Sequence, residues 1–305
     1  MSVQHDTQQP SQSQPQFQPQ TGASVAKAYL YIVATPIGNM GDITARAIDT
    51  LKKVDIIACE DTRTSGKLLS NFGIDTQTWA YHEHNSEVQT PKIIEMIQRG
   101  HSVALISDAG TPLISDPGYQ LVQAAHAANV AVVPVVGASA AIAALSVAGL
   151  PSDKFSFVGF LPAKTHGRVK QLQEYAERSE TLIFYEAPHR IVASLKDMAE
   201  VFGGNRPATL CRELTKTFET VKKSTLGDLV DFVEADNNQQ KGEIVLVVGG
   251  NINDVNDDLN VYDPLLLRLL EDLSVKKAAA LASDITGVKK NALYQRLLEL
   301  QQQQS

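Results

Sequence analysis

The sequence predicts an α/β protein with two successive α/β domains and a C-terminal helical region. Short apolar, β-branched runs alternate with segments whose apolar residues recur at helical spacing, which is typical of a mainly parallel α/β sheet. This alternation of predicted strands and helices is interrupted near Leu150-Pro151 and then continues with a second set of elements. An acidic stretch follows before the last helices. We therefore expect α/β domains at 28–150 and 151–250, a linker at 251–262 and a helix-turn-helix region at 263–305.

The first domain is expected to open with a strand that stops at a Thr-Pro pair. The boundaries of one helix can be predicted from its end residues. Thr90 is expected to be its N-cap, Pro91 its first residue and Gly100 the residue beyond its end. Apolar runs and helical spacing predict strands at 28–34, 55–59, 102–107 and 130–136, and helices at 41–54, 90–100, 119–129 and 139–149.

The second domain is expected to begin with the segment FSFVGFLPAK and a basic helix. Strands are then predicted at 181–187, 208–214 and 243–250, with helices at 191–203 and near 226–235. Beyond the linker, two or three short helices are expected, with a turn containing Gly287 between two of them. This is a helix-turn-helix pattern with lysines available, and a small helical bundle without a nucleic-acid role is nearly as well supported.

The ends of the chain and its cysteines indicate a cytoplasmic protein without a membrane partner. Residues 1–27 are rich in Gln and Pro, lack the charged and apolar regions of a secretory signal, and predict a disordered tail. No apolar stretch approaches the ~20 residues needed to cross a bilayer. The two cysteines, Cys59 and Cys211, have neither disulfide nor zinc spacing, which fits a reducing compartment.

The net charge of -7 argues against a protein that coats nucleic acid nonspecifically. Two segments depart from this average. Residues 164–223 hold eleven Lys and Arg against eight Asp and Glu, and residues 274–305 hold five against two, so each segment carries +3. From charge alone, solvated helix faces are the better interpretation of both segments.

Several common chemistries are not supported by any motif. No G-x-G-x-x-G follows the first strand, no P-loop is present, and no H-E-x-x-H or paired C-x-x-C occurs. The segment His82-Glu83-His84 is more simply a surface loop, so we expect no metal. Polar loops at 35–39, 60–63, 107–118 and 137–140 instead follow the predicted strands, at the sheet edge where α/β proteins bind ligands.

These loops carry a resemblance to a known family. The segments that carry it are LYIVATPIGNMGDITARAIDTLKKVDIIACEDTRTSGKLL, ALISDAGTPLISDPG, VVGASAAIAAL, FVGFLP, TLIFYEAPHR, CRELTKTFE and KGEIVLVV. They resemble the ribosomal RNA small subunit methyltransferase I family, within the tetrapyrrole methylase superfamily. The resemblance runs from Ala28 to Gly250, and a helix-turn-helix like that of 263–300 is also typical of the family. It implies a homodimer whose two α/β domains hold S-adenosylmethionine in the cleft between them. The implied reaction is 2'-O-methylation of a cytidine in the decoding region of 16S ribosomal RNA, within the small ribosomal subunit and without a metal.

The resemblance also implies which residues bind the cofactor. In the wider superfamily a G-D-P turn contacts it, and here the matching turn is Ser107-Asp108-Ala109, so Asp108 is carried over although the tripeptide is not. The positions in the second domain are mostly apolar, and a core role competes evenly there. The full set is Pro36, Asp108, Gly110, Thr111, Ala138, Ser139, Phe184, Tyr185, Ala187, Gly242 and Ile244.

Catalysis would require orientation of the hydroxyl and removal of its proton. Glu60 or Glu186 is favoured as the acidic partner and Arg63 as a phosphate contact, although an ion pair of Glu60 with Arg63 is an equally supported interpretation. The sequence does not single out a general base. The candidates for RNA binding are Lys164, Arg168, Lys170, Arg190, Lys289 and Lys290. Contacts of the C-terminal helices with the second subunit or with a ribosomal protein are open alternatives.

Two other functions remain open at this point. A methylase of uroporphyrinogen or a corrin precursor would share the cofactor loops, but the EDTR and YEAPHR segments and the added helices argue against it. A ligand-sensing regulator that binds DNA would need a strongly basic recognition helix, and VKKNALYQRLLEL is only mildly basic.

Overall fold

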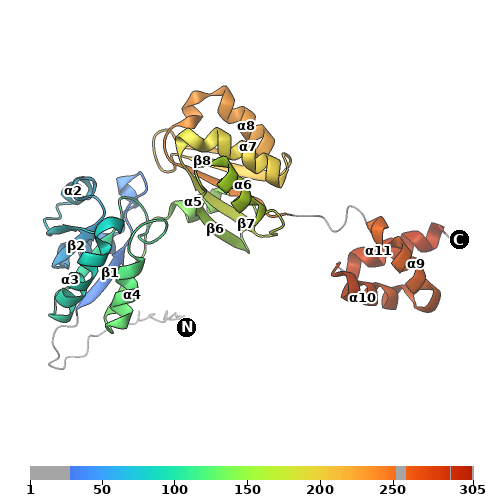
Figure 1. Cartoon of the computed structure of the whole chain (residues 1–305), viewed down its shortest axis with the longest axis horizontal. Coiled ribbons are helices and arrows are strands. Elements are labelled where there is room, and N and C mark those ends of the chain that lie inside the picture. The colour runs from blue at the N-terminus through green and yellow to red at the C-terminus, as the bar shows by residue number, and fades with distance from the viewer. Residues whose placement is uncertain (1–27, 252–258, 289, 304–305) are drawn as a thin grey trace, which may run out of the picture.

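The structure is a computed structural model that describes residues 28–251, 259–288 and 290–303. It contains two α/β parts and a C-terminal helical bundle, which follow one another along the chain (Figure 1). The predicted tail at 1–27 and most of the predicted linker lie outside the described residues. Within the described part of the chain, no helix is long and apolar enough to cross a bilayer.

The first sheet has five parallel strands in the order β3-β2-β4-β1-β5. The central strands β2 and β4 are buried at every position because helices cover both faces of the sheet. Helices α1 and α2 pack on one face and α3 and α4 on the other. The elements are β1 Tyr29–Val33, α1 Ala45–Lys53, β2 Ile56–Cys59, α2 Thr62–Asn71, β3 Thr78–Ala80, α3 Ser86–Gln98, β4 Val103–Ile106, α4 Tyr119–Ala127 and β5 Ala131–Val135.

Helix α3 begins four residues before the predicted N-cap, so the prediction for Thr90 is wrong. The Thr90 hydroxyl lies 3.0 Å from the buried Tyr81 hydroxyl instead of capping the helix. Pro91 lies in the second turn, where its missing N–H removes one helical hydrogen bond. The turn before the helix is held by Asn85, whose side chain accepts from His82 N and donates to the Ala80 carbonyl.

The second sheet has the order β6-β7-β10-β8-β9, and only β6 and β7 are parallel. The mainly parallel arrangement of the first sheet therefore does not extend to the second. The last strand, β10, inserts antiparallel between β7 and β8, and β9 pairs antiparallel with β8 at the edge. The elements are β6 Phe155–Phe160, α6 Thr165–Gln173, β7 Thr181–Glu186, α7 Ile191–Phe202, β8 Pro207–Arg212, β9 Thr220–Thr225, α8 Leu226–Ala235 and β10 Ile244–Val248.

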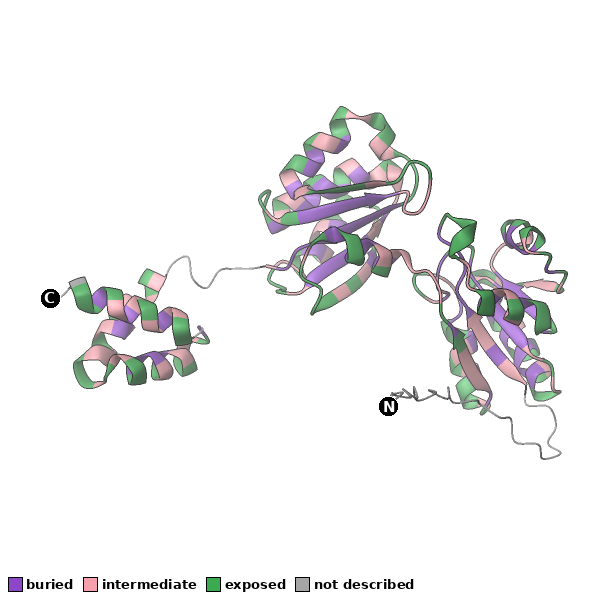
Figure 2. Cartoon of the chain, turned by 180° about the vertical axis from the view of Figure 1, so that it is seen from behind, coloured by how far each residue is buried: buried purple, intermediate pink, exposed green. Residues whose placement is uncertain are grey.

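Helix α5, Ala140–Ala148, packs on the second sheet although it precedes the predicted boundary at residue 150. Its small apolar side chains contact Ile183, Cys211, Val245 and Val247, while α6, α7 and α8 cover the opposite face. Figure 2 shows the buried strands of this sheet below its helices. The chain thus crosses from one sheet to the other at 136–139, directly after β5.

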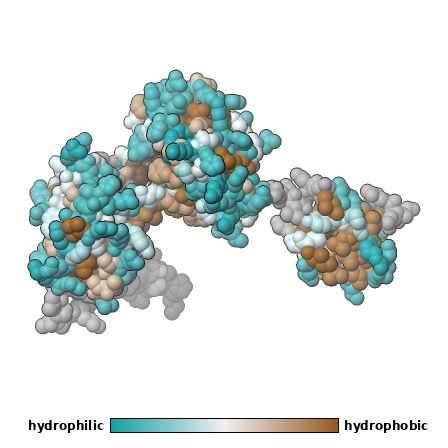
Figure 3. All heavy atoms as spheres, in the orientation of Figure 1, coloured by the Kyte–Doolittle hydropathy of each residue, from teal (hydrophilic) through white to brown (hydrophobic). Residues whose placement is uncertain are grey.

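The C-terminal bundle consists of α9 Asp263–Asp272, α10 Val275–Thr286 and α11 Lys290–Gln303, with a short 3-10 helix at Leu259–Tyr262. Gly287, at φ 74°, ends α10 and begins the turn, as expected for a helix-turn-helix. The three helices share one apolar core, and Arg296 joins α11 to α9 through two bonds of 2.9 and 2.6 Å to Asp263. Apolar residues are also visible on the surface of this bundle (Figure 3).

Candidate functional site

A pocket of about 370 Å³ lies where the carboxyl ends of the first sheet's strands meet the second sheet. This volume is in the range of small-molecule sites, and the edge is the one where parallel α/β sheets bind ligands. From the first part of the chain it is lined by Ile37, Ala109, Gly110, Thr111, Ile114, Ser115, Asp116, Ser139 and Ala140. The second sheet contributes Phe160, Tyr185, Glu186, Ala187, Pro188, Gly242, Glu243, Ile244 and Val245.

Most residues proposed to bind the cofactor are brought together around this pocket, even though they come from both sheets. They are Gly110, Thr111, Ser139, Tyr185, Ala187, Gly242 and Ile244. Four others do not line it: Pro36, Asp108, Ala138 and Phe184. Phe184 is fully buried in the core beneath the helices, because neighbouring residues of β7 point to opposite faces of the sheet and Tyr185 takes the pocket side. A side-chain contact of Phe184 with the cofactor is therefore corrected to a core role.

The loop at 107–118 is fixed by its neighbours. Thr35 and Gly110 exchange backbone hydrogen bonds of 2.8 and 3.1 Å, and the Thr111 hydroxyl donates to the Ala138 carbonyl at 2.9 Å. Gly110 has φ 81°, while Leu113 and Ser115 also have positive φ although they are not glycines. Such conformations cost free energy and persist where the surroundings enforce them, so the loop presents a fixed backbone to the pocket.

Tyr185 links β7 to the start of α5. Its hydroxyl accepts a hydrogen bond of 3.2 Å from Ala141 N, and its ring packs against Phe157 and Phe160 at centroid distances of 4.9 and 5.6 Å. Burial raises the pKa of its phenol, so the group stays neutral near physiological pH. Tyr185 is thus an anchor of the pocket wall.

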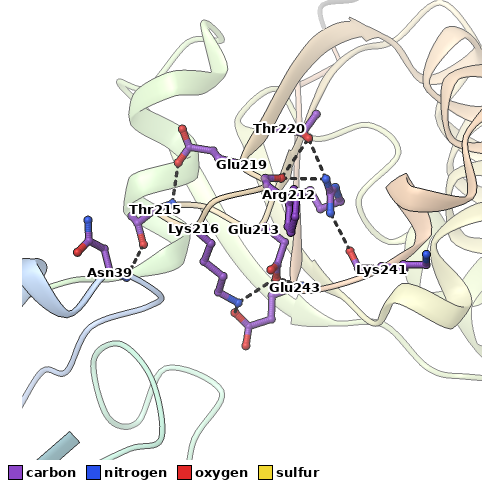
Figure 4. A network of polar contacts seen from close by, with 10 residues as sticks. Asn39, Arg212, Glu213, Thr215, Lys216, Glu219, Thr220, Lys241 and Glu243 are labelled. Atoms are coloured by element: carbon purple, nitrogen blue, oxygen red, sulfur yellow. Dashed lines mark hydrogen bonds and ion pairs between the residues drawn. The ribbon is translucent and has the colours of Figure 1, made fainter. Parts of the chain in front are cut away.

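A polar network connects the two α/β parts beside the pocket (Figure 4). Asn39 N donates to the Thr215 hydroxyl at 3.0 Å across the two parts. Lys216 Nζ donates to Glu213 at 2.9 Å and to Glu243 at 2.8 Å. Glu213 also accepts from Glu243 N at 2.8 Å, which fixes the wall that Glu243 forms.

Two glycines make this arrangement possible. A Cβ on Gly38 would lie 2.5 Å from Lys216 Cγ, so the loops could not approach as closely with any other residue there. Gly242 has φ 81°, and a Cβ on it would lie 2.4 Å from the Glu213 carboxyl. Both positions therefore require glycine for the pocket wall to keep its shape.

Acidic side chains gather at the ends of β2 and β4. Asp108 accepts a hydrogen bond of 3.4 Å from Asp61 N, and burial raises the pKa of Asp108. Burial and then the charge of Asp108 raise the pKa of Glu60. Burial and the charges of Glu60 and Asp108 raise the pKa of Asp116 to about 6, against a hydrogen bond from Ser107 that lowers it. The pocket thus lies beside a concentration of negative charge.

The three catalytic candidates from the sequence differ in position. Glu60 does not line the pocket, and the exposed Arg63 pairs with Asp61 at 3.4 Å rather than with Glu60. Glu186 does line it, but its carboxylate accepts from the Ser194 hydroxyl, from Ala187 N at 2.7 Å and from Arg190 at 2.6 Å. These donors already engage both of its carboxylate oxygens.

Among the RNA-binding candidates, Arg168 requires correction. It is 2% exposed, and its guanidinium donates to Asp197 at 2.6 Å and to Ala163 O and Thr165 at 3.2 Å. A side chain so enclosed does not reach a phosphate. Arg190 is held by Glu186, whereas Lys164, Lys170 and Lys290 are exposed, and Lys289 lies outside the described residues.

Among the pocket residues that the sequence did not single out are Asp116, Phe160 and Glu243. Each lies inside a segment that carried the resemblance, namely LISDPG, FVGFLP and KGEIV. Asp116 is the second aspartate of the same polar loop as Asp108, eight residues later. Its place in the same polar loop could have indicated a pocket position, because the residues at 109–111 and at 114–116 of this loop line the pocket.

Comparison with known proteins identifies the family. The model of the Tetrapyrrole (Corrin/Porphyrin) Methylases matches residues 29–230, and that of the RsmI C-terminal HTH domain matches residues 258–301. The ribosomal RNA small subunit methyltransferase I of Pseudomonas aeruginosa is 54% identical over 89% of this chain and 97% of its own length. The protein of the same name from Escherichia coli O157:H7 is 50% identical over 92% and 98%. The chain belongs to the ribosomal RNA small subunit methyltransferase I family.

Solved structures place this family member within a wider fold. The uroporphyrin-III-C-methyltransferase of Thermus thermophilus has 21% identity and a TM-score of 0.52, and covers 73% of this chain and 94% of its own. Diphthine synthase has 15% identity and a TM-score of 0.56, with 73% and 90% covered. At such identities the likeness shows the fold alone. The two sheets of the chain therefore have the tetrapyrrole methylase-type fold.

Proposed function

We propose that the chain transfers a methyl group from S-adenosylmethionine to the ribose 2'-hydroxyl of a cytidine in the decoding region of 16S ribosomal RNA. The observation that carries this proposal is the pocket between the two sheets, in a chain that belongs to a ribosomal RNA methyltransferase family. The relatives from Pseudomonas aeruginosa and Escherichia coli are named for the small ribosomal subunit, which supports that particle as the substrate.

The residues of the pocket suit the proposed cofactor. Ile37, Ile114 and Phe160 offer apolar surface for the adenosine, and the backbone at Gly110 is free of a Cβ. The Asp116 carboxylate supplies negative charge beside the space where a sulfonium or ammonium group would lie. When bound, the cofactor supplies an electrophilic methyl group, so the protein must chiefly orient the two reactants and move a proton.

The charge around the pocket indicates how RNA would approach. The carboxyl groups of Glu60, Asp108 and Asp116 would repel a phosphate placed close to them. The exposed Lys164 and Lys170 on and beside α6 offer phosphate contacts instead. We therefore propose that the substrate is a ribose presented by a shaped site in the assembled subunit, with modest affinity for free RNA.

The two alternative functions are less well supported by the structure. A uroporphyrinogen or corrin precursor carries many carboxylates, which the acidic side of the pocket would repel. A DNA-binding regulator would need free cations on α11, yet Arg296 is already bound to Asp263 and Glu299. Among the described residues of that helix, Lys290 alone remains exposed and cationic.

We propose that the enzyme acts as a cytoplasmic homodimer. Phe155 and Phe157 on the edge strand β6, and Ile142 and Val147 on α5, are exposed apolar side chains that a second copy would cover. Sedimentation equilibrium is expected to give twice the chain mass of 33.0 kDa. A single 33.0 kDa species at micromolar concentration would contradict the dimer.

The test of the proposed reaction uses small ribosomal subunits from a strain that lacks this protein. Incubation with the full chain and S-adenosylmethionine is expected to produce 2'-O-methylcytidine, measured by mass spectrometry of the nucleosides. Large subunits, and small subunits without cofactor, are the matched controls. If no methylated cytidine forms while calorimetry shows that the cofactor binds, the proposed RNA substrate is wrong and anionic tetrapyrroles become the substrates to test.

A further inference from the structure

We propose that Asp116 is the catalytic base, which accepts the proton of the ribose hydroxyl. This inference deepens the proposed function and rests on it. Asp116 was not among the residues that the sequence or the family resemblance singled out. It follows from comparing the carboxylates that line the pocket.

Three carboxylates line the pocket, and two of them are engaged with cations. Glu186 is bound by Arg190 and Ser194, and Glu243 accepts a hydrogen bond of 2.8 Å from Lys216. Asp116 has no ion pair with any described residue, and the nearby Ser107 hydroxyl only lowers its pKa by hydrogen bonding. A carboxylate without a cation keeps its lone pairs available for a substrate proton. By this criterion Asp116 is the pocket carboxylate suited to act as a base.

The position of Asp116 is fixed by its loop. Ser115 precedes it with φ 65°, and Pro117 follows it with a restricted φ. The Ser115 hydroxyl lies against the bulge of β6, 3.3 Å from where a Cβ of Gly159 would stand. The loop therefore contacts the second sheet as well as the first. A base held in this way needs little reorganisation when the substrate arrives.

The groups that face Asp116 are acids from both sheets. Glu60 and Asp108 approach it from the ends of β2 and β4, and the Tyr185 phenol approaches it from β7. Burial first, and then the charges of Glu60 and Asp108, raise the pKa of Asp116 to about 6. The group is then mostly ionised at neutral pH and more basic than an ordinary carboxylate, as general base catalysis requires.

The groups already named account for every bond and proton in the methyl transfer. Asp116 accepts the hydroxyl proton as the ribose oxygen forms its bond to the methyl carbon, and the carbon–sulfur bond breaks with its electron pair left on sulfur. The protonated Asp116 returns its proton to solvent after product release. No metal or further reactant is needed.

The test compares wild-type protein with Asp116→Asn, which keeps the size of the side chain and can still bond to Ser107. Single-turnover methylation of small subunits is measured at saturating cofactor, at pH values on both sides of 6. The wild-type rate is expected to fall as the pH drops through about 6, because Asp116 becomes protonated. The variant is expected to lose a factor of ~10² or more in rate and to lack this pH dependence, while the Kd for cofactor rises far less than the rate falls.

Glu60→Gln provides an independent check. Loss of the neighbouring charge lowers the pKa of Asp116, so the acid limb of the rate profile is expected to move to lower pH. Thermal unfolding adds a readout that does not involve activity. Because the folded-state pKa is raised, ionised Asp116 destabilises the fold above pH 6, and Asp116→Asn should raise Tm there but not below pH 4.

Three results would overturn the inference. The first is an Asp116→Asn variant that methylates at the wild-type rate with the same pH profile. The second is a Kd for cofactor that rises in step with the loss of rate, which would make Asp116 a cofactor ligand. The third is a wild-type protein that binds cofactor but methylates no subunit. This result contradicts the proposed function itself, and the wild-type measurement alone distinguishes it from a failure of the inference about Asp116.

Discussion

Replacing Arg168 with Leu is expected to lower the free energy of unfolding by about 3–5 kcal/mol. Arg168 is 2% exposed and binds Asp197 at 2.6 Å, so the substitution leaves a buried carboxylate without its cation. Asp197 lies on α7 and Arg168 on α6, and the pair joins these two helices over the second sheet. The measurement is urea-induced unfolding of the wild-type and variant chains.

A matched control comes from the same helix. Lys170 is exposed two residues later, and Lys170→Leu is expected to change stability by less than about 0.5 kcal/mol. The double variant Arg168→Leu with Asp197→Leu should recover much of the loss, because it removes both buried charges together. Equal stability of the Arg168 and Lys170 variants would show that the ion pair does not support the fold.

Replacing Gly110 with Val is expected to weaken cofactor binding by tenfold or more, equivalent to about 1.4 kcal/mol. Gly110 lines the pocket at φ 81°, which a β-branched residue adopts only with strain. Its Cβ would also approach Ile37 to 3.3 Å, so the loop must shift away from the position that shapes the pocket. The measurement is calorimetric titration with S-adenosylmethionine.

Gly203→Val separates local strain from an effect on the pocket. Gly203 follows α7 at φ 91° and has no heavy atom within 4 Å of its Cβ position. Both variants should therefore lose stability, at roughly 1–3 kcal/mol each. Only the Gly110 variant should lose cofactor affinity. Equal affinities of the two variants would show that this loop does not contact the cofactor.

Four of the five strands of the first sheet were predictable from the sequence because they are apolar runs, and the central ones are buried on both faces. Val103–Ile106, for example, is a continuous apolar run that ends at a polar loop, and residues of that loop line the pocket. Short or exposed elements were missed. The strand Thr78–Ala80 has three residues, and Thr220–Thr225 is an edge strand with exposed lysines, so neither carries an apolar run.

The candidate site was predictable only in part, because packing between distant segments decides it. Nothing local shows that β10 inserts antiparallel, and this pairing sets which residues of β7 face the pocket. Phe184 and Tyr185 are chemically similar neighbours, yet they lie on opposite faces of the sheet. Arg168 resembles a surface cation in its basic segment until its partner, Asp197, is brought beside it from 29 residues away.

The packing of α5 on the second sheet has a consequence for synthesis on the ribosome. The first sheet is complete once β5 has emerged, but the contacts of α5 with Val245 and Val247 require β10, about a hundred residues later. At roughly 5–20 residues per second, the apolar side of this helix stays uncovered for about 5–20 s in every nascent chain. During that interval the first sheet is folded and the second is not. The nascent chain then most needs protection from aggregation.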